Sequence, residues 1–564
     1  MANRLALSLI SLNASWARQQ LMRKTHHIMA AQEQFLKKLL RAHASTALGQ
    51  QFRLQDIRTL EDFRRRVPIS PYEFYEPYLD RVAQGESCVL NPDPVTYLNL
   101  TSGSTGRKKR VPVTQRFQHT RQQANLASLG YAISSLKHHH RSFGPALLTD
   151  SAKPQGVTFA GIPYGSVSAG RLHLGTGQPE QLFSPPIEAL EISEPLTRQY
   201  VCLLFALRNR TLKGWVANFP MLILRTCHFL ERYADELIED LQGGTIAPWL
   251  KIDEPIRDRL EQQWSADKTR AAELAAIVTQ AGRLTPRTVW PQLSYVTTAR
   301  GGTSDFYLQR FPDYFGDIPI FGGVYESAEA TFSICPEVNS EGGILALESG
   351  FFEFIPANQW DRDQPATLLP TELTVGDLYR VLVTNYSGFY RYDSGDVVEV
   401  VGFYNQSPLI VFRHRDGEVL SATLEKTTEY HLTQVMQRLQ QEFGLLFEDF
   451  CITLSEHEFP ARYVVNLELA AGYTLLKPST FLQRFDYWLC QVNRSYGKAR
   501  QSHLPPPCLR ILPSCSFVTL RQRQVNRGMF DSHLKLPHLC QDHNFLAAIP
   551  AQLEVNLNRL SLVS

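Results

Sequence analysis

The sequence predicts an α/β fold, with a large N-terminal domain of mixed sheets and helices and a smaller α+β C-terminal domain. Three observations support this prediction. Between residues 95 and 410, short apolar runs alternate with longer helical patterns, as in α/β proteins with a largely buried sheet. Several of these runs are followed by turns that contain glycine, where open α/β sheets place ligands. A charged turn at residues 413–417 then interrupts the apolar pattern, and a mixed segment follows it.

The elements are expected in the following order. Residues 1 to 85 should be helical, with an apolar stripe over 35–40, until Pro68 and Pro71 interrupt the chain. The apolar runs expected to be strands are 97–100, 146–148, 215–217, 294–297, 318–321, 351–355 and 379–384. The helical patterns between them cover 196–213, 219–242 and 254–281. After the charged turn, apolar residues at 432, 435, 436 and 439 predict another helix.

Length and charge narrow the classes of protein that remain. A chain of 564 residues is long enough for several domains, and we expect an N-terminal domain over 1–412, a hinge at 413–417 and a mobile C-terminal domain over 418–564. The chain has 57 Lys and Arg against 55 Asp and Glu, a net charge of +2. This near-neutral balance gives no reason to expect a nucleic acid or an anionic membrane as partner. No apolar run approaches the length of about 18 residues that a membrane span needs.

The nine cysteines are scattered singly, without a Cys-x-x-Cys pair. Cys508 and Cys515 lie near two histidines, but their spacing matches no common zinc-ligand pattern. Reduced thiols in the cytoplasm fit this distribution best. The N-terminal apolar stretch is short and continues into charged sequence, which favours an amphipathic helix over a signal peptide.

The segment Thr-Ser-Gly-Ser-Thr-Gly-Arg-Lys-Lys at 101–109 has the composition of a phosphate-binding loop. Its two glycines allow backbone N–H groups to point inward, its hydroxyls add donors and a lysine supplies positive charge, which points to ATP. The glycines stand too close together for a Walker-type loop. The residues expected at the phosphates are Thr101, Ser102, Gly103, Ser104, Thr105 and Gly106. A solvated, flexible loop would have the same composition, so other segments must decide.

Two further segments suit a nucleotide. In 322–329, Tyr325 can cover the face of an adenine and Glu329 can hold the magnesium ion that accompanies ATP. In 388–398, Asp396 on a turn after a strand can accept both ribose hydroxyls. Each residue also has a structural explanation, as a core-edge ring, a charge at a helix N-terminus and a turn former. Their combination and order favour the functional interpretation.

These segments and several others resemble the adenylate-forming superfamily and, within it, the auxin-responsive Gretchen Hagen family of acyl acid amido synthetases. The resemblance runs nearly from end to end. The segments that carry it are 67–73, 77–85, 101–109, 325–329, 352–356, 390–396, 402–403 and 527–537.

The resemblance implies an adenylate-forming N-terminal domain and roles for particular residues. Lys535 corresponds to the superfamily's mobile lysine, and Lys109 is a better candidate than Lys108 for the lysine that follows the glycine loop. The resemblance makes Lys535, Lys109 and Glu329 catalytic, with Glu329 also holding Mg²⁺. It places ATP on the loop together with Tyr325, Ser327, Asp396 and Arg413.

The implied activity is that of an ATP-dependent carboxylate–amine ligase. It would join a small carboxylic acid to AMP with release of pyrophosphate, then transfer the acyl group to an amine or amino acid. Two alternatives stay open: transfer to a thiol of coenzyme A or of a carrier protein, and a nucleotide-binding protein without catalysis. Ala328 and the pair at 393–394 depart from the plant pattern without removing a group that the chemistry needs. The resemblance does not extend to the residues of the acyl pocket, so it implies neither an auxin nor a jasmonate as substrate, and a bacterial-type member fits at least as well. The sequence leaves the oligomeric state open.

Overall fold

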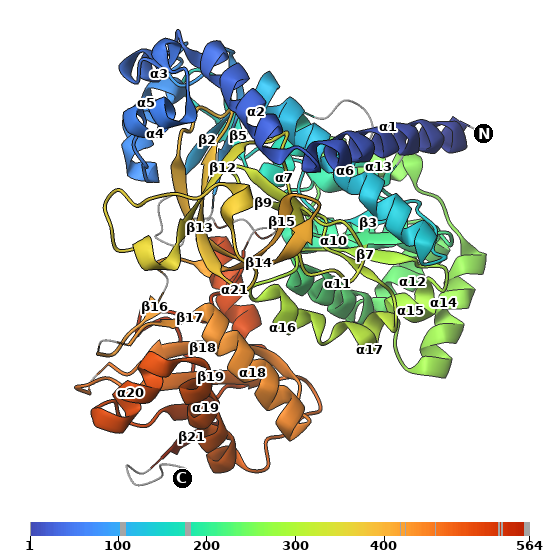
Figure 1. The fold of residues 1–564 in the computed structure, drawn as a ribbon. Helices are drawn as coiled ribbons and strands as arrows, with labels where there is room; N and C mark the ends of the chain where they lie inside the picture. The colour runs from blue at the N-terminus through green and yellow to red at the C-terminus, as the bar shows by residue number, and fades with distance from the viewer. Residues whose placement is uncertain are drawn as a thin grey trace. The chain divides into compact units, whose positions relative to one another are not determined.

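The computed structural model of the chain describes residues 2–101, 109–174, 182–417, 419–423, 425–456, 458–527, 529, 531 and 534–557, with side chains from residue 8 onward. The chain forms two compact units (Figure 1). The N-terminal unit contains Met1–Arg300 and Phe311–Phe412, and the C-terminal unit contains Gly301–Arg310 and Arg413–Ser564. Each unit is described by itself.

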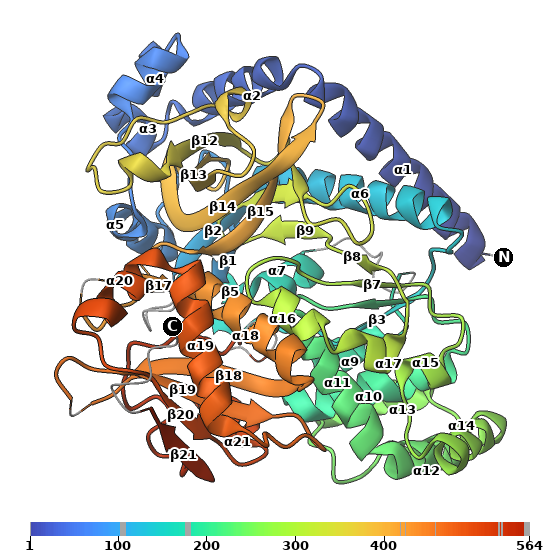
Figure 2. The ribbon, with the colours of Figure 1, turned by 60° about the horizontal axis from the view of Figure 1, so that its bottom comes forward.

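The N-terminal unit mixes helices and strands, as the sequence predicts. Its helices are α1 (Ala2–Thr25), α2 (Ile28–His43), α3 (Ala47–Gln51), η1 (Leu54–Asp56), α4 (Leu60–Arg66), α5 (Tyr72–Ala83), α6 (Gln115–His138), α7 (Val167–His173), α9 (Ile187–Glu191), α10 (Pro195–Arg208), α11 (Pro220–Arg232), α12 (Ala234–Gly243), α13 (Glu254–Gln263), α14 (Lys268–Ala281), α15 (Pro286–Val289), α17 (Phe311–Phe315), η2 (Ala357–Gln359) and η3 (Pro370–Glu372). The long helices α1 and α6 run side by side (Figures 1 and 2).

Three sheets form the framework of this unit. Their strands are β1 (Val95–Leu100), β2 (Arg110–Thr114), β3 (Ala146–Leu148), β4 (Gly156–Val157), β5 (Pro163–Gly165), β6 (Gly214–Val216), β7 (Tyr295–Thr297), β8 (Ile320–Phe321), β9 (Val324–Glu326), β10 (Thr331–Ile334), β11 (Gly343–Leu345), β12 (Phe351–Pro356), β13 (Leu378–Thr384), β14 (Tyr392–Tyr404) and β15 (Ser407–Arg415). The sheet orders are β2-β1-β5-β4, β3-β6-β7-β8 and β12-β13-β14-β15-β11-β10-β9.

The expected strands are all present, and the α/β class is confirmed. The strands of the sheet β3-β6-β7-β8 are all parallel, so helices connect the end of each strand to the start of the next. These strands are largely buried, which explains why their sequences are apolar. The seven-stranded sheet contains long antiparallel pairings, such as β12 with β13 in register from Phe351 opposite Thr384. Between α4 and α5, the two prolines interrupt the helical pattern as expected, and Pro71 becomes the N-cap residue of α5.

The C-terminal unit is smaller and also mixed. Its helices are α16 (Ser304–Leu308), α18 (Glu429–Phe443), α19 (Pro478–Val492), α20 (Arg494–Ser502) and α21 (Ser516–Asn526), and its strands are β16 (Val419–Leu420), β17 (Thr427–Thr428), β18 (Phe447–Leu454), β19 (Tyr463–Leu469), β20 (Cys508–Ile511) and β21 (Leu553–Asn556). The last four strands form one sheet in the order β18-β19-β20-β21. Helices α18 and α19 pack against each other (Figure 2).

The segment Gly301–Arg310 groups with the C-terminal residues, whereas the sequence assigns it to the N-terminal domain by position. Buried polar contacts explain the difference. The Tyr307 hydroxyl donates to Asp449 at 3.0 Å, and Arg310 forms an ion pair with Glu448 at 2.8 Å. These partners lie on β18, more than a hundred residues along the chain, so no local pattern reveals them.

The charged segment at 413–417 is only partly a turn. Strand β15 continues through Arg415, and the turn is confined to Asp416 and Gly417. Arg413 and Arg415 alternate with the buried His414, and both arginines are partly exposed, so the strand can continue through them. The position of a hinge within this segment stays a prediction. None of the helices in the described part of the chain is long and apolar enough to cross a membrane.

Candidate functional site

The glycine loop connects two antiparallel strands. Strands β1 and β2 pair up to Leu100 opposite Arg110, and Thr101 N donates to Lys109 O at 3.0 Å, which closes the base of the loop. The predicted phosphate-binding residues 102–106 lie outside the described residues. Within the described part, the Thr101 hydroxyl is buried and has no hydrogen-bond partner. A buried unpaired donor at the mouth of this loop is suited to an anionic ligand.

Lys109 and Glu329 are brought together through a tyrosine that the sequence analysis did not single out. Lys109 Nζ lies 3.5 Å from the Tyr392 hydroxyl, which itself donates to Glu329 Oε1 at 3.0 Å. Lys109 Nζ also lies 5.2 Å from the centre of the Tyr72 ring, close enough for a cation–π contact. Burial raises the pKa of Tyr72 to about 12, so this ring is neutral beside the lysine. The two predicted catalytic residues of this unit therefore share one polar cluster.

The backbone around Glu329 is tightly fixed. The hydroxyl of Ser327 accepts from Glu329 N at 3.1 Å and from Ala330 N at 3.3 Å, forming the turn between β9 and β10. Asn385 Nδ2 donates to Glu329 O at 2.7 Å. The predicted contact of Ser327 with nucleotide stays a prediction, since its hydroxyl serves here to shape the turn that presents Glu329.

Tyr325 and Asp396 form the second part of the site. The Tyr325 hydroxyl donates to Asp396 Oδ2 at 2.7 Å, and the Tyr325 ring stacks on Phe332 with centres 4.8 Å apart. Asp396 is 2% exposed, and its N–H donates to Ser394 Oγ at 3.2 Å. The pair predicted to meet adenine and ribose is thus joined directly.

Asp396 lies inside strand β14 and not on a turn after a strand, which corrects the sequence prediction. The pairing of β14 with β13 shifts between Asp393 opposite Leu382 and Val397 opposite Arg380. The extra residues include Gly395 at φ 75°, a conformation that glycine adopts without strain. Ser394, Gly395 and Asp396 therefore form a bulge, which has the residue composition of a turn and changes the direction in which the Asp396 side chain points.

An ion pair that the sequence analysis missed lies beside this site. Arg121 on α6 binds Glu326 at 2.5 Å and donates to Ser327 O at 3.2 Å. Burial alone would raise the pKa of Glu326, but Arg121 and Arg171 hold it below the ordinary value. This ion pair fixes the strand that carries Tyr325 to α6. Glu326 stands within a recognised motif, but nothing near Arg121 in the sequence points to a partner 205 residues away.

A second buried ion pair supports Tyr392. Arg391 donates from Nε to Glu353 Oε2 at 2.9 Å and from Nη2 to Oε1 at 3.2 Å, and Arg64 shares the same carboxylate at 3.0 Å. Arg391 has φ 43°, an uncommon conformation for a residue other than glycine. The bidentate contact with Glu353 offsets this strain and fixes the backbone of Arg391, the residue directly before Tyr392.

Lys535 and Arg413, the remaining predicted residues, lie in the C-terminal unit. Lys535 Nζ donates to Glu429 Oε2 at 3.2 Å, and the other oxygen of Glu429 accepts from His538 N at 2.9 Å. Burial would raise the pKa of Glu429, but the charge of Lys535 and the neighbouring His538 keep it lowered. The guanidinium of Arg413 lies 5.3 Å from the centre of the Tyr430 ring. Glu429 therefore holds Lys535 at the start of α18.

The N-terminal cluster has the groups that bind and polarise a charged phosphorylated ligand. It offers a lysine, a buried carboxylate of a type that holds Mg²⁺, a loop with an unpaired hydroxyl and a tyrosine–aspartate pair. Its chemistry fits a nucleotide with a metal ion.

Comparison with known proteins is consistent across the chain. Three domain models match, described as the GH3 family N-terminal domain at residues 17–320, the GH3 family central domain at 343–415 and the GH3 family C-terminal domain at 430–544. Together they cover most of the chain.

Named relatives and solved structures agree with these matches. The indole-3-acetic acid-amido synthetase GH3.4 of Arabidopsis thaliana is 25% identical, over 90% of this chain and 88% of the relative. The 4-substituted benzoates-glutamate ligase GH3.12 of the same plant is 26% identical, over 80% of each chain. The structure of the GH3.15 acyl acid amido synthetase has a TM-score of 0.83 and 22% identity, covering 96% of this chain and 97% of that one, and shows the same fold. The two named relatives are from a plant, and the solved structure is of a GH3 enzyme. None of the three supports the expectation of a bacterial-type member.

Proposed function

Because this chain belongs to the GH3 family, which the sequence motifs predict, we propose that it is an ATP-dependent acyl acid amido synthetase. It joins a small carboxylic acid to AMP, releasing pyrophosphate, and transfers the acyl group to an amine or amino acid, releasing AMP. The relatives named above act on an indole acid and on substituted benzoates, the latter with glutamate. Because these acids differ, the family alone does not fix the acid for this chain.

One observation carries the proposal. Three motifs meet in the N-terminal unit, where Lys109 of the glycine loop is linked through the Tyr392 hydroxyl to Glu329, although Lys109 is more than 200 residues from either partner. Such an arrangement supplies a positive and a negative group at the mouth of a phosphate-binding loop. A structural ion pair would not need the loop beside it, whose buried Thr101 hydroxyl has no partner among the described residues.

The first reaction needs stabilisation of negative charge at the α-phosphate. A carboxylate oxygen of the acid attacks phosphorus, the bond to pyrophosphate breaks, and the acyl-AMP mixed anhydride forms. We assign Lys109 and the loop to the phosphates, Asp396 to the ribose hydroxyls and Tyr325 to the adenine. Glu329 would hold Mg²⁺, which neutralises phosphate charge when bound. Arg413 is assigned to the nucleotide by the family resemblance.

The second reaction replaces AMP with an amine. A neutral amine nitrogen attacks the acyl carbon, the bond from that carbon to the phosphate oxygen breaks, and the amine loses a proton. We propose that Lys535 acts in the first reaction by placing its positive charge near the carboxylate and α-phosphate. A rotation of the C-terminal domain near 413–417 would then withdraw Lys535 and admit the amine. Glu429 would hold the lysine while it is withdrawn.

The test offers the purified chain ATP, Mg²⁺, a panel of aryl, indole, fatty and hydroxy acids, and a mixture of amino acids. The proposal predicts an amide, together with AMP and pyrophosphate in equal amounts, for a subset of acids. Formation of ADP and phosphate would contradict it, because that product pair belongs to acyl-phosphate chemistry.

The acceptor is tested separately from adenylation. Acids that give AMP are offered coenzyme A in place of the amine. An amide with an amino acid and no thioester supports the proposal, whereas a thioester and no amide would assign the chain to the thiol-transferring alternative. ATP binding without turnover for any acid would favour a nucleotide-binding protein without catalysis.

A cytoplasmic location forms part of the proposal and is supported by nine cysteines that are all unpaired.

A further inference from the structure

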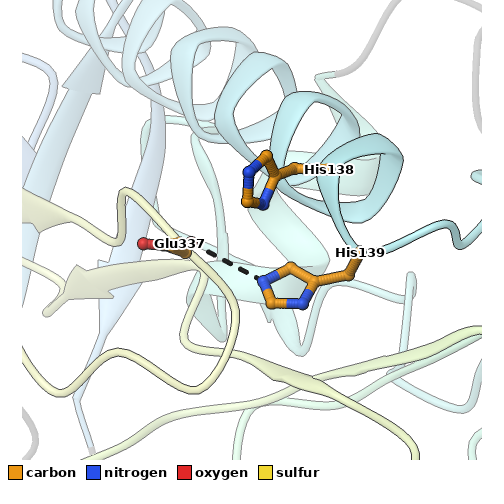
Figure 3. Close-up of side chains that lie close together, drawn as sticks. All are labelled: His138, His139 and Glu337. Carbon is orange, nitrogen blue, oxygen red and sulfur yellow. Dashed lines mark ion pairs between the residues drawn. The ribbon is translucent and has the colours of Figure 1, made fainter.

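Two histidines and a glutamate, none of which belongs to the motifs discussed above, gather at the surface of the N-terminal unit (Figure 3). His138 is the last residue of α6 and His139 is its C-cap, while Glu337 lies on the segment between β10 and β11. One potential ligand atom from each side chain lies within 4.8 Å of the other two. His139 Nε2 and Glu337 Oε1 are 3.6 Å apart, as the dashed line marks. All three side chains are exposed.

These donors are those that a divalent transition metal prefers. Two imidazoles and one carboxylate are found at zinc sites with three protein ligands, where water takes the fourth position. In a tetrahedral site with bonds of about 2.0 Å, neighbouring ligand atoms stand about 3.3 Å apart. The separation of His139 from Glu337 is already close to this value, so small rotations of exposed side chains would complete the geometry. Exposure also gives the ion a direct path to the site.

The backbone on both sides of the cluster is fixed independently of any ion. Val338 N donates to Ser135 Oγ on α6 at 3.0 Å, and His139 N donates to Ser135 O at 3.0 Å. Asn339 N donates to Ile320 O at 2.7 Å, which anchors the other side of the segment. One serine thus ties the end of α6 to the segment that carries Glu337. Binding would therefore restrict side chains only, which lowers its entropic cost.

We propose that His138, His139 and Glu337 form a binding site for a divalent transition-metal ion of the zinc type. The bound ion links the C-terminal end of α6 to the segment between β10 and β11. It stabilises the folded unit because the unfolded chain holds these ligands far apart. This site goes beyond the proposed function and does not depend on it. The competing explanation is an exposed ion pair between His139 and Glu337, which would contribute little to stability.

The test titrates ZnCl₂ into the full chain, produced without a histidine tag and stripped with chelator, by isothermal calorimetry. The expected result is one ion per chain at this site and a melting temperature that rises with zinc and returns when EDTA is added. His139→Ala and Glu337→Gln should each weaken binding about tenfold or more, since losing one of three ligands leaves an incomplete site. The double variant His138→Ala/His139→Ala should lose the site.

The chain offers a matched control in the adjacent histidine. His140 has φ 55° and lies outside the cluster, so His140→Asn, which tolerates this conformation, should bind zinc like the parent. The proposal is overturned if the double variant binds as tightly as the parent, or if His140→Asn weakens binding as much as His139→Ala. Circular dichroism of each variant separates loss of the site from loss of the fold. Hydrogen exchange at 335–339 that slows with zinc in the parent alone would support the link to α6.

Discussion

At the scale of single residues, the sequence identifies chemical groups better than their surroundings. The sequence predicts Tyr325, Glu329 and Asp396 at a nucleotide, and in the structure Tyr325 and Asp396 are in direct contact. The sequence does not reveal that Tyr392 links Lys109 to Glu329, or that Arg121 forms an ion pair with Glu326. Their roles depend on partners far along the chain, which residue type and local spacing do not encode.

Asp396 tests the assignment of the ribose site. Asp396→Asn replaces one carboxylate oxygen by an amide donor, so a hydroxyl of the ligand would lose its acceptor at a buried position. We expect the KM for ATP to rise about tenfold, measured by acid-dependent exchange of pyrophosphate into ATP. Tyr325→Phe, which keeps the ring, should have a smaller effect.

Asp393 provides the matched control for this prediction. It lies on the same strand and pairs with Arg380 at 3.0 Å. Asp393→Asn removes the same charge three residues away and should leave the KM for ATP within about twofold of the parent. Equal effects of the two substitutions would show that Asp396 acts through the strand and not through the nucleotide.

At the scale of elements, the sequence predicts helices and strands well and irregularities poorly. Every expected strand is found, since the parallel strands β3, β6, β7 and β8 and the antiparallel strands β12 and β13 all consist largely of buried apolar residues. The sequence predicts a turn where the structure has the bulge that holds Asp396, because Ser394, Gly395 and Asp396 have a composition that suits both. Only the pairing with β13 distinguishes the two.

Helix α2 predicts a measurable dependence of stability on pH. His43 at its end is 1% exposed and lies 2.9 Å from the Tyr390 hydroxyl. Burial, and to a smaller extent the charge of Arg116, lowers the pKa of His43 from 6.5 to about 3. Below pH 6.5 the unfolded chain takes up a proton that the folded chain does not, so stability falls as the pH drops from 6.5 towards 3.

The slope from this one group should rise from about half of 1.4 kcal/mol per pH unit at pH 6.5 to about 1.4 kcal/mol per pH unit near pH 5. His43→Gln cannot titrate, so the difference in free energy of unfolding between it and the parent should shift by about 2 kcal/mol in favour of the variant between pH 6.5 and 4.5. Urea unfolding at both pH values measures this shift. His27→Gln changes the exposed histidine immediately before α2 and should show no such shift. A constant difference for His43→Gln would contradict the lowered pKa.

At the scale of the whole molecule, the sequence predicts two parts but not their membership. The segment Gly301–Arg310 belongs to the C-terminal unit through Tyr307 and Arg310, although the chain on both sides belongs to the other unit. The order of the motifs nevertheless predicts the family, because that order can be read directly from the sequence, whereas contacts between distant residues cannot. A hinge at 413–417 and the site residues stay predictions.

Lys535 tests the division of labour between the units. Lys535→Ala should reduce adenylation about a hundredfold or more, since a positive charge next to the transition state is lost. ATP binding, measured by calorimetry, should change little. Lys498→Ala removes an exposed lysine from α20 of the same unit and should leave both quantities unchanged. Unchanged adenylation in Lys535→Ala would remove this lysine from the mechanism.

The most direct test of the proposed function is acid-dependent exchange of radiolabelled pyrophosphate into ATP, measured with the panel of acids before any amine is added. The account predicts exchange with a subset of acids in the parent, loss of that exchange in Lys535→Ala, and amide formation when an amino acid is supplied to the active combinations. Amide formation with ADP as the nucleotide product, or no exchange with any acid while ATP still binds, would contradict it.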